Sequence, residues 1–66
     1  MQVFDVNGKE INHGDEVLMP EPNGTDIHNH DFVGYVNDIL DNGNIIVEDG
    51  DSDFFEIEAN RVEIQD

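Results

Sequence analysis

Short runs in which apolar and polar residues alternate, divided by turn residues, limit what this chain can fold into more than any other feature. Alternation with a period of two is typical of half-buried β-strands, and no segment keeps a 3.6-residue apolar period over three turns. The sequence therefore predicts an all-β fold without α-helix, and the regular turn spacing favours a small barrel or sandwich. Turn signals lie at Asn7-Gly8, His13-Gly14, the loop 20–31, Asn42-Gly43 and Gly50. The strands predicted between them are 2–5, 16–19, 32–40, 44–49, 54–59 and 62–64.

The strongest local signal is Asn42-Gly43 between two apolar runs. It predicts a β-hairpin with a type I′ turn, whose two central residues both need positive φ. In the preceding strand, Gly34 indicates a sharp bend, and a bulge near Asn37-Asp38 is needed to bring Ile39 to the buried side. Alternation assigns the rest of the core to Val17, Met19, Phe32, Val36, Ile45, Val47, Phe55, Ile57, Val62 and Ile64.

The length predicts a single domain that spans residues 1–66. A domain of this size buries only about 60% of the surface that its unfolded chain exposes. The chain contains no Cys, so disulfides, thiolate metal sites and a Cys nucleophile are excluded. No apolar stretch is long enough for a signal peptide or a membrane span, and a cytoplasmic location is expected.

The charge balance is strongly acidic. Seventeen Asp and Glu residues stand against only Lys9 and Arg61, which gives a formal net charge of −15. Direct binding to nucleic acid or to an anionic membrane needs clustered Lys and Arg, so this charge opposes both. We therefore expect the partner to present a basic protein surface.

Several short motifs occur in the order found in SH3-like barrels. Asn12-His13-Gly14-Asp15-Glu16-Val17 contains the Gly-Asp-x-Val that opens their first barrel strand, and Phe32-Val33-Gly34-Tyr35-Val36 contains the Gly-x-Val of their second. The segment 43–47 resembles their third strand. The segments 54–57 and 61–64 are similar to their last two, joined by a 3₁₀ turn that is expected here at 59–61. The resemblance implies an SH3-like barrel of five to six short antiparallel strands from Asn12 onward.

Within that class, the chain looks most like small acidic proteins of bacteria and their mobile elements. The motifs specify a fold and not an activity, because SH3-like barrels bind proline-rich peptides, methylated lysines, RNA or ribosomal partners. This chain has no Trp for a peptide groove and too few basic residues for RNA. A non-catalytic protein-binding module is therefore the main expectation.

Asp49, Asp51 and Asp53 stand at alternate positions, as the first ligands of a calcium-binding EF-hand loop do. That loop also needs a Gly at its sixth position and a Glu at its twelfth, where this chain has Phe54 and Asn60. Both flanks are predicted strands. An acidic hairpin tip is the favoured interpretation, and weak binding of a divalent cation is left open.

The segment 26–31 places His28 and His30 on the same side of an extended loop, near Asp26 and Asp31. Two imidazoles and a carboxylate suit zinc or iron. A loop of this composition is by default a polar surface loop, so no metal or other cofactor is predicted, and metal binding stays an alternative.

An enzyme is not expected. The hydroxyl side chains are Thr25, Tyr35 and Ser52, and no nucleophile with an identifiable base stands out among them. A barrel of this size is also expected to have no room for a pocket of ~300 Å³ or more.

Alternation leaves four apolar side chains on the outer face of the predicted barrel. Exposed aromatic residues with an acidic rim suit contact with a basic protein. The predicted partner-binding site is Val33, Tyr35, Ile46 and Phe54, with Asp49, Asp51 and Asp53 as an acidic margin. The competing interpretation is that one of the four packs beneath the long loop or against the N-terminal strand, Phe54 more readily than Tyr35.

The alternative function is a nucleic-acid mimic that occupies a DNA- or RNA-binding protein. A compact domain of this length is roughly 28 Å across, and B-DNA of that length carries about 16 charges. The net charge of −15 is close to that density. A mimic needs its carboxylates in rows, whereas these acids are spread over every predicted turn and strand.

Overall fold

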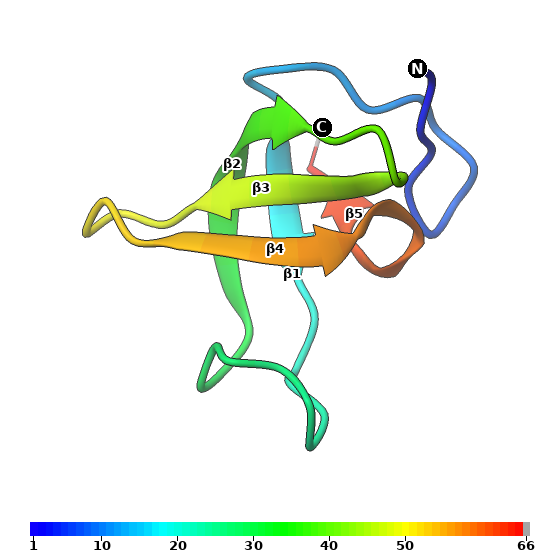
Figure 1. Cartoon of the computed structure of the whole chain (residues 1–66). Coiled ribbons are helices and arrows are strands. Elements are labelled where there is room, and N and C mark those ends of the chain that lie inside the picture. The colour runs from blue at the N-terminus through cyan, green and yellow to red at the C-terminus, as the bar shows by residue number, and fades with distance from the viewer. Residues whose placement is uncertain (66) are drawn as a thin grey trace.

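The computed structural model describes residues 1–65, and within them it is all-β with no α-helix (Figure 1). The elements are β1 (Glu16–Met19), β2 (Phe32–Ile39), β3 (Asn44–Glu48), β4 (Phe54–Glu58), the 3₁₀ turn η1 (Ala59–Arg61) and β5 (Glu63–Ile64). All strand pairs are antiparallel, and they form one sheet in the order β4-β3-β2-β1-β5. The predicted all-β class and the predicted 3₁₀ turn are confirmed.

The sheet is strongly curved. In Figure 1, β3 and β4 cross β1 at a steep angle, and β5 returns beside β1 after η1. Its concave side holds the core. Seven predicted core residues are buried and four, Phe32, Ile39, Phe55 and Ile64, are partly buried against them. The seven buried ones are Val17, Met19, Val36, Ile45, Val47, Ile57 and Val62.

The long strand β2 has the predicted bulge, and Gly34 lies at a close contact with β3. Its register against β3 shifts between Val36 and Asp38, and this bulge brings Ile39 against the core. Gly34 lies where β3 passes closest, because a Cβ atom built there would be 2.6 Å from the backbone oxygen of Glu48. A glycine is needed at this contact because no side chain fits.

The N-terminal segment differs from the prediction. Residues 2–5 form no strand, and the segment instead doubles back through an isolated bridge between Phe4 and Glu10. The N–H of Ile11 donates to the carbonyl of Val3 at 2.9 Å, and both side chains are buried in the core. Sequence alternation missed these two core residues, because the short hairpin that carries them depends on a side chain and not on a strand pattern.

That side chain is Asp5, which is only 4% exposed. Its Oδ1 accepts hydrogen bonds from the backbone N–H groups of Asn7 and Lys9, at 2.9 and 2.8 Å, and its Oδ2 accepts one from Ile64 at 2.9 Å. Burial raises the pKa of the Asp5 carboxyl. The three backbone hydrogen bonds, helped by the charge of Lys9, outweigh burial and hold the pKa below its ordinary value. One ionised carboxylate therefore ties the N-terminal hairpin to β5.

The β2–β3 turn is not the type I′ turn predicted from Asn42-Gly43. Gly43 has a φ of 91°, but Asn42 does not have positive φ. The N–H of Gly43 donates to Leu40, and the N–H of Leu40 donates to Asn44. These bonds define a three-residue loop, a type I turn followed by one left-handed residue. The turn was predicted at the right place, but only one of its residues needs the conformational freedom of glycine.

The β3–β4 turn repeats this geometry with a different left-handed residue. Here Ser52 donates to Asp49 and Asp49 donates to Asp53, and Ser52 has a φ of 65°. Asp49 offsets part of the strain of this left-handed residue, because its Oδ1 accepts hydrogen bonds from the backbone N–H groups of Asp51 and Asp53 at 2.8 and 3.0 Å. The acidic stretch is thus a hairpin tip, as predicted.

We expect Ser52→Gly to raise the free energy of unfolding by about 0.5 kcal/mol. Relief of the left-handed strain of a non-glycine residue exceeds the extra backbone entropy that glycine gives the unfolded chain. The reciprocal change at the equivalent position, Gly43→Ser, should lower the free energy of unfolding by a similar amount. Urea denaturation of both variants checks the pair, and a loss of stability in Ser52→Gly would contradict it.

Candidate functional site

Three side chains form one row across the outer face of the sheet. Tyr35 on β2 pairs with Glu48 on β3, and Glu48 pairs with Phe54 on β4. Tyr35 and Phe54 are each 54% exposed. We call these three residues the outer row. A carboxylate thus lies between two exposed aromatic rings.

The rest of the outer face mixes apolar and acidic side chains. Val33 is exposed on β2, and Ile46 on β3 is half-buried. Glu56 pairs with Ile46 and Glu16 pairs with Tyr35, so acidic residues border the apolar ones on both sides. The four apolar residues predicted to face outward do so, and neither Tyr35 nor Phe54 packs beneath the long loop.

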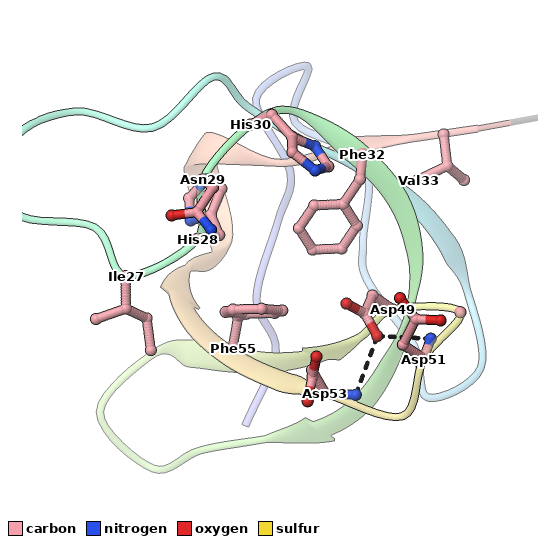
Figure 2. A pocket seen from close by; sticks show the side chains of 11 residues that line it. Ile27, His28, Asn29, His30, Phe32, Val33, Asp49, Asp51, Asp53 and Phe55 are labelled. Atoms are coloured by element: carbon pink, nitrogen blue, oxygen red, sulfur yellow. Dashed lines mark hydrogen bonds between the residues drawn. The ribbon is translucent and has the colours of Figure 1, made fainter.

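A hollow of about 360 Å³ lies between the loop 20–31 and the β3–β4 turn (Figure 2). We call it the mouth pocket. It is lined by 27–30, Phe32, Val33, 49–51, Asp53 and Phe55. A second, more open hollow of about 390 Å³ lies beside Val3, Phe4, 42–44 and 58–60. The expectation that so small a domain has no room for such a pocket is wrong, because both hollows lie at the surface, beside loops and turns and outside the packed core.

Three aromatic rings form the inner wall of the mouth pocket. The ring centroids of Phe32 and Phe55 are 5.5 Å apart, and the His28 ring meets each of them edge-on at 6.0 Å. Figure 2 shows Phe32 and Phe55 between the long loop and the aspartates of the hairpin tip. Neighbouring Phe54 and Phe55 therefore serve different surfaces, since alternation along β4 points them to opposite sides of the sheet.

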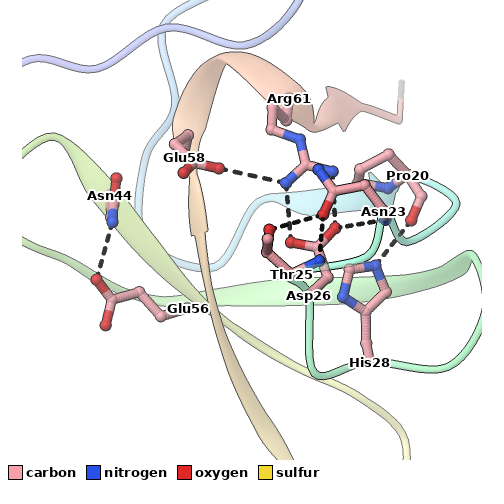
Figure 3. A network of polar contacts seen from close by, with 9 residues as sticks. All are labelled: Pro20, Asn23, Thr25, Asp26, His28, Asn44, Glu56, Glu58 and Arg61. Carbon is pink, nitrogen blue, oxygen red and sulfur yellow. Dashed lines mark hydrogen bonds and ion pairs between the residues drawn. The ribbon is translucent and has the colours of Figure 1, made fainter.

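The segment 26–31 is a surface loop, as its composition predicts, except at His28. His28 is 6% exposed, and its Nε2 lies 2.9 Å from the carbonyl oxygen of Pro20 (Figure 3). His30 is exposed, with its ring against the edge of Phe32. The two histidines differ in burial because the His28 side chain packs between the loop and the rings of Phe32 and Phe55. The residues next to His28 in the sequence give no sign of this contact.

A second anchor holds the same loop to η1. The Arg61 guanidinium donates to both carboxylate oxygens of Asp26, at 3.0 and 2.8 Å, and also contacts Glu58 at 3.3 Å (Figure 3). The hydrogen bonds from Arg61, foremost, and from the backbone N–H of Asn23 hold the pKa of the Asp26 carboxyl well below its usual range. Bidentate pairing of this kind fixes the orientation of the two side chains as well as bringing opposite charges together.

The hairpin tip presents its carboxylates to the mouth pocket. One Asp49 oxygen is occupied by the turn, whereas the Asp51 and Asp53 carboxylates accept no hydrogen bond from the residues that the structure describes. Among residues 1–65, no group of three His, Asp or Glu side chains is arranged to hold a metal ion. Neither the aspartate run 49–53 nor the segment 26–31 therefore brings three such side chains together.

The structure divides the predicted site between two surfaces. Tyr35, Ile46 and Phe54 belong to the outer face and Asp49, Asp51 and Asp53 line the mouth pocket, while Val33 lies on the outer face at the margin of the pocket and also lines it. Sequence reasoning missed Phe32, Phe55 and His28 as pocket residues, because it placed the two phenylalanines in the core and the histidine on the surface. The available signal was position, since His28 lies within the long loop, Phe32 directly follows it, and Phe55 lies two residues after Asp53.

No family model, curated protein or solved structure matches this chain. Within the described residues, no helix has the length and apolar character needed to cross a membrane.

Proposed function

We propose that this protein is a non-catalytic, acidic protein-binding module that engages a basic protein through its outer row. The observation that carries this proposal is the row itself, in which Tyr35 and Phe54, both 54% exposed, flank the carboxylate of Glu48. Aromatic residues dominate the energy of protein interfaces, and a carboxylate between them selects a cationic group on the partner.

The remaining charges support the same assignment. The amide of Asn37 donates to one Glu48 oxygen at 3.2 Å, which orients this carboxylate on the exposed face. With a net charge of −15, the chain attracts basic surfaces over distances of about a Debye length and increases the association rate. The order of strands, with η1 before β5, also supports the proposed SH3-like barrel, a fold that presents such faces to partners.

Affinity capture from an extract of the native cytoplasm tests the proposal. We expect the immobilised protein to retain a basic protein, and the double variant Tyr35→Ala/Phe54→Ala to retain it at least tenfold less well, because each ring acts as an interface anchor. Raising NaCl from about 0.05 to 0.5 M should release it, because the Debye length falls severalfold.

Val6→Ala is the matched control, because Val6 is an exposed apolar residue in the N-terminal hairpin, outside the outer row. It should retain the partner as the wild type does. Retention that is insensitive to both salt and the double variant contradicts the proposal. Competition by a short DNA duplex would identify the partner as a nucleic-acid binder and support mimicry, whereas retention unaffected by the duplex removes mimicry.

A further inference from the structure

We propose that the mouth pocket is a second binding site, which takes one cationic side chain of the basic partner and prefers arginine. The inference extends the proposed function, because it rests on a basic partner, but it concerns a different surface and a different kind of contact. It is carried by the meeting of aromatic rings, carboxylates and an open volume of about 360 Å³ at one end of the sheet.

The aromatic wall supplies the first part of such a site. Phe32 and Phe55 are both half-buried, with centroids 5.5 Å apart and planes inclined by 56°. Two inclined rings make a corner in which a flat cation can lie against one face and meet the edge of the other. A cation within about 6 Å of a ring centroid is attracted by the negative face of the ring.

The hairpin tip supplies the second part. Asp51 and Asp53 line the same hollow, and their carboxylates accept no hydrogen bond from residues 1–65. Lining residues include no Lys or Arg, and Arg61 is engaged by Asp26 and Glu58 on the far side of the loop. The negative charge of the pocket is therefore compensated by no cationic side chain that lines it.

The site is also preorganised. His28, hydrogen-bonded to the carbonyl of Pro20, holds the loop wall against the two phenylalanine rings. The Arg61–Asp26 pair fixes the loop from its other side. On the opposite wall, Asp49 fixes the hairpin tip through the backbone N–H groups of Asp51 and Asp53. Walls that are already ordered lose little entropy when a ligand enters.

The chemistry favours a guanidinium over an ammonium or a metal ion. Guanidinium is planar, weakly hydrated, able to stack on an aromatic face and able to bond a carboxylate with two N–H groups. An ammonium is more strongly hydrated and offers no flat face. The phenyl rings of Phe32 and Phe55 are not metal ligands, and among the described residues no group of three His, Asp or Glu side chains is arranged to hold a metal ion.

Titration with N-acetyl-L-arginine amide, followed by two-dimensional amide NMR of the whole protein, tests the inference. We expect saturable shifts confined to residues 27–33 and 49–55, with Kd of about 1 mM or weaker for a single side chain. The lysine analogue should bind more weakly, and the uncharged citrulline analogue should produce no saturable shift. Equal binding of the lysine analogue overturns the preference for arginine, and equal binding of the citrulline analogue overturns the whole assignment.

Two variants test the walls separately. Asp53→Asn keeps the backbone bonds of the turn, and should weaken binding of the arginine probe about threefold, while Phe55→Leu removes the ring face and should weaken it about fivefold. Asp41→Asn removes the same charge from the exposed β2–β3 turn and should leave the affinity within twofold. If Asp53→Asn binds as Asp41→Asn does, the site is wrong even where Phe55→Leu fails to fold.

These outcomes separate the pocket from the outer row. The probe needs no partner, and Tyr35→Ala/Phe54→Ala should leave its affinity unchanged. Probe binding that fails while the double variant still loses the partner overturns the pocket and leaves the proposed function standing. Probe binding at the mouth pocket with no partner captured supports the pocket and counts against the outer row.

Discussion

Replacing Asp5 with asparagine is expected to lower the free energy of unfolding by about 3 kcal/mol. The carboxylate accepts three backbone N–H groups in a buried position, from Asn7, Lys9 and Ile64. Asparagine has the same shape but only one acceptor oxygen, so its amide N–H₂ must point at a backbone donor and leave that donor unsatisfied. The total free energy of unfolding of a 66-residue domain is about 3 to 10 kcal/mol, so this loss is a large part of its stability.

The effect of Asp5→Asn should depend on pH in a defined direction. The folded-state pKa of Asp5 is below its ordinary value of 3.8, so this carboxylate stabilises the fold fully at pH values above the unfolded pKa. That contribution disappears as pH falls through the folded pKa. The difference in unfolding free energy between wild type and variant should therefore be constant near neutral pH and shrink below about pH 4.

Urea denaturation from pH 7 to pH 2 measures this difference, with Asp41→Asn as the matched control. Asp41 is exposed in the β2–β3 turn, and its carboxylate accepts no hydrogen bond from any residue in 1–65. The Asp41→Asn variant loses the same charge as Asp5→Asn, so it corrects for the change in self-repulsion of an acidic chain. A cost for Asp5→Asn no greater than that of Asp41→Asn would show that the buried carboxylate does not tie the N-terminal hairpin to β5.

Asp5 also shows where sequence reasoning stopped. Alternation predicts β1 to β5 and most of the core, because it records which face of each strand is buried. The fold of the N-terminal segment depends instead on a contact between Asp5 and Ile64, 59 positions apart. In the sequence this aspartate is one of 17 acids, and nothing local marks it as the buried one.

The same reason explains why only part of the proposed binding surfaces was predicted. Tyr35 and Phe54 were predicted to be exposed, because strand alternation alone decides their orientation. The mouth pocket was missed because it lies between a loop and a turn, and its wall is assembled by tertiary contacts of His28. Periodicity carries no information about a loop that a buried histidine closes.

Gly34→Ala is expected to cost about 3 kcal/mol or more in unfolding free energy. The added Cβ atom would be 2.6 Å from the Glu48 backbone oxygen, 2.7 Å from Cγ1 of Val47 and 3.1 Å from Cε2 of Phe32. A side chain could rotate away, but a backbone oxygen in a paired strand moves only if β3 moves away from β2. Overpacking of this kind costs about 1 to 3 kcal/mol, and occasionally more when backbone must shift.

Gly24→Ala is the control, because a Cβ atom there meets nothing within 4 Å and the backbone has no positive φ. It should change the unfolding free energy by at most about 0.5 kcal/mol, and the sign should favour alanine. Thermal and urea denaturation of both variants give the comparison. Similar stabilities for the two would show that β3 does not pack directly over Gly34.

The consequence of Gly34→Ala should extend to both proposed binding sites. Gly34 lies between Val33, which lines the mouth pocket, and Tyr35, which begins the outer row. The close approach of β3 at this glycine sets the position of Glu48 in one site and of the hairpin tip in the other. Under conditions where the variant is still folded, its amide NMR shifts should therefore change at Glu48 and at residues 49–53 together. A change confined to the neighbours of residue 34 would mean that the two surfaces are positioned independently of this contact.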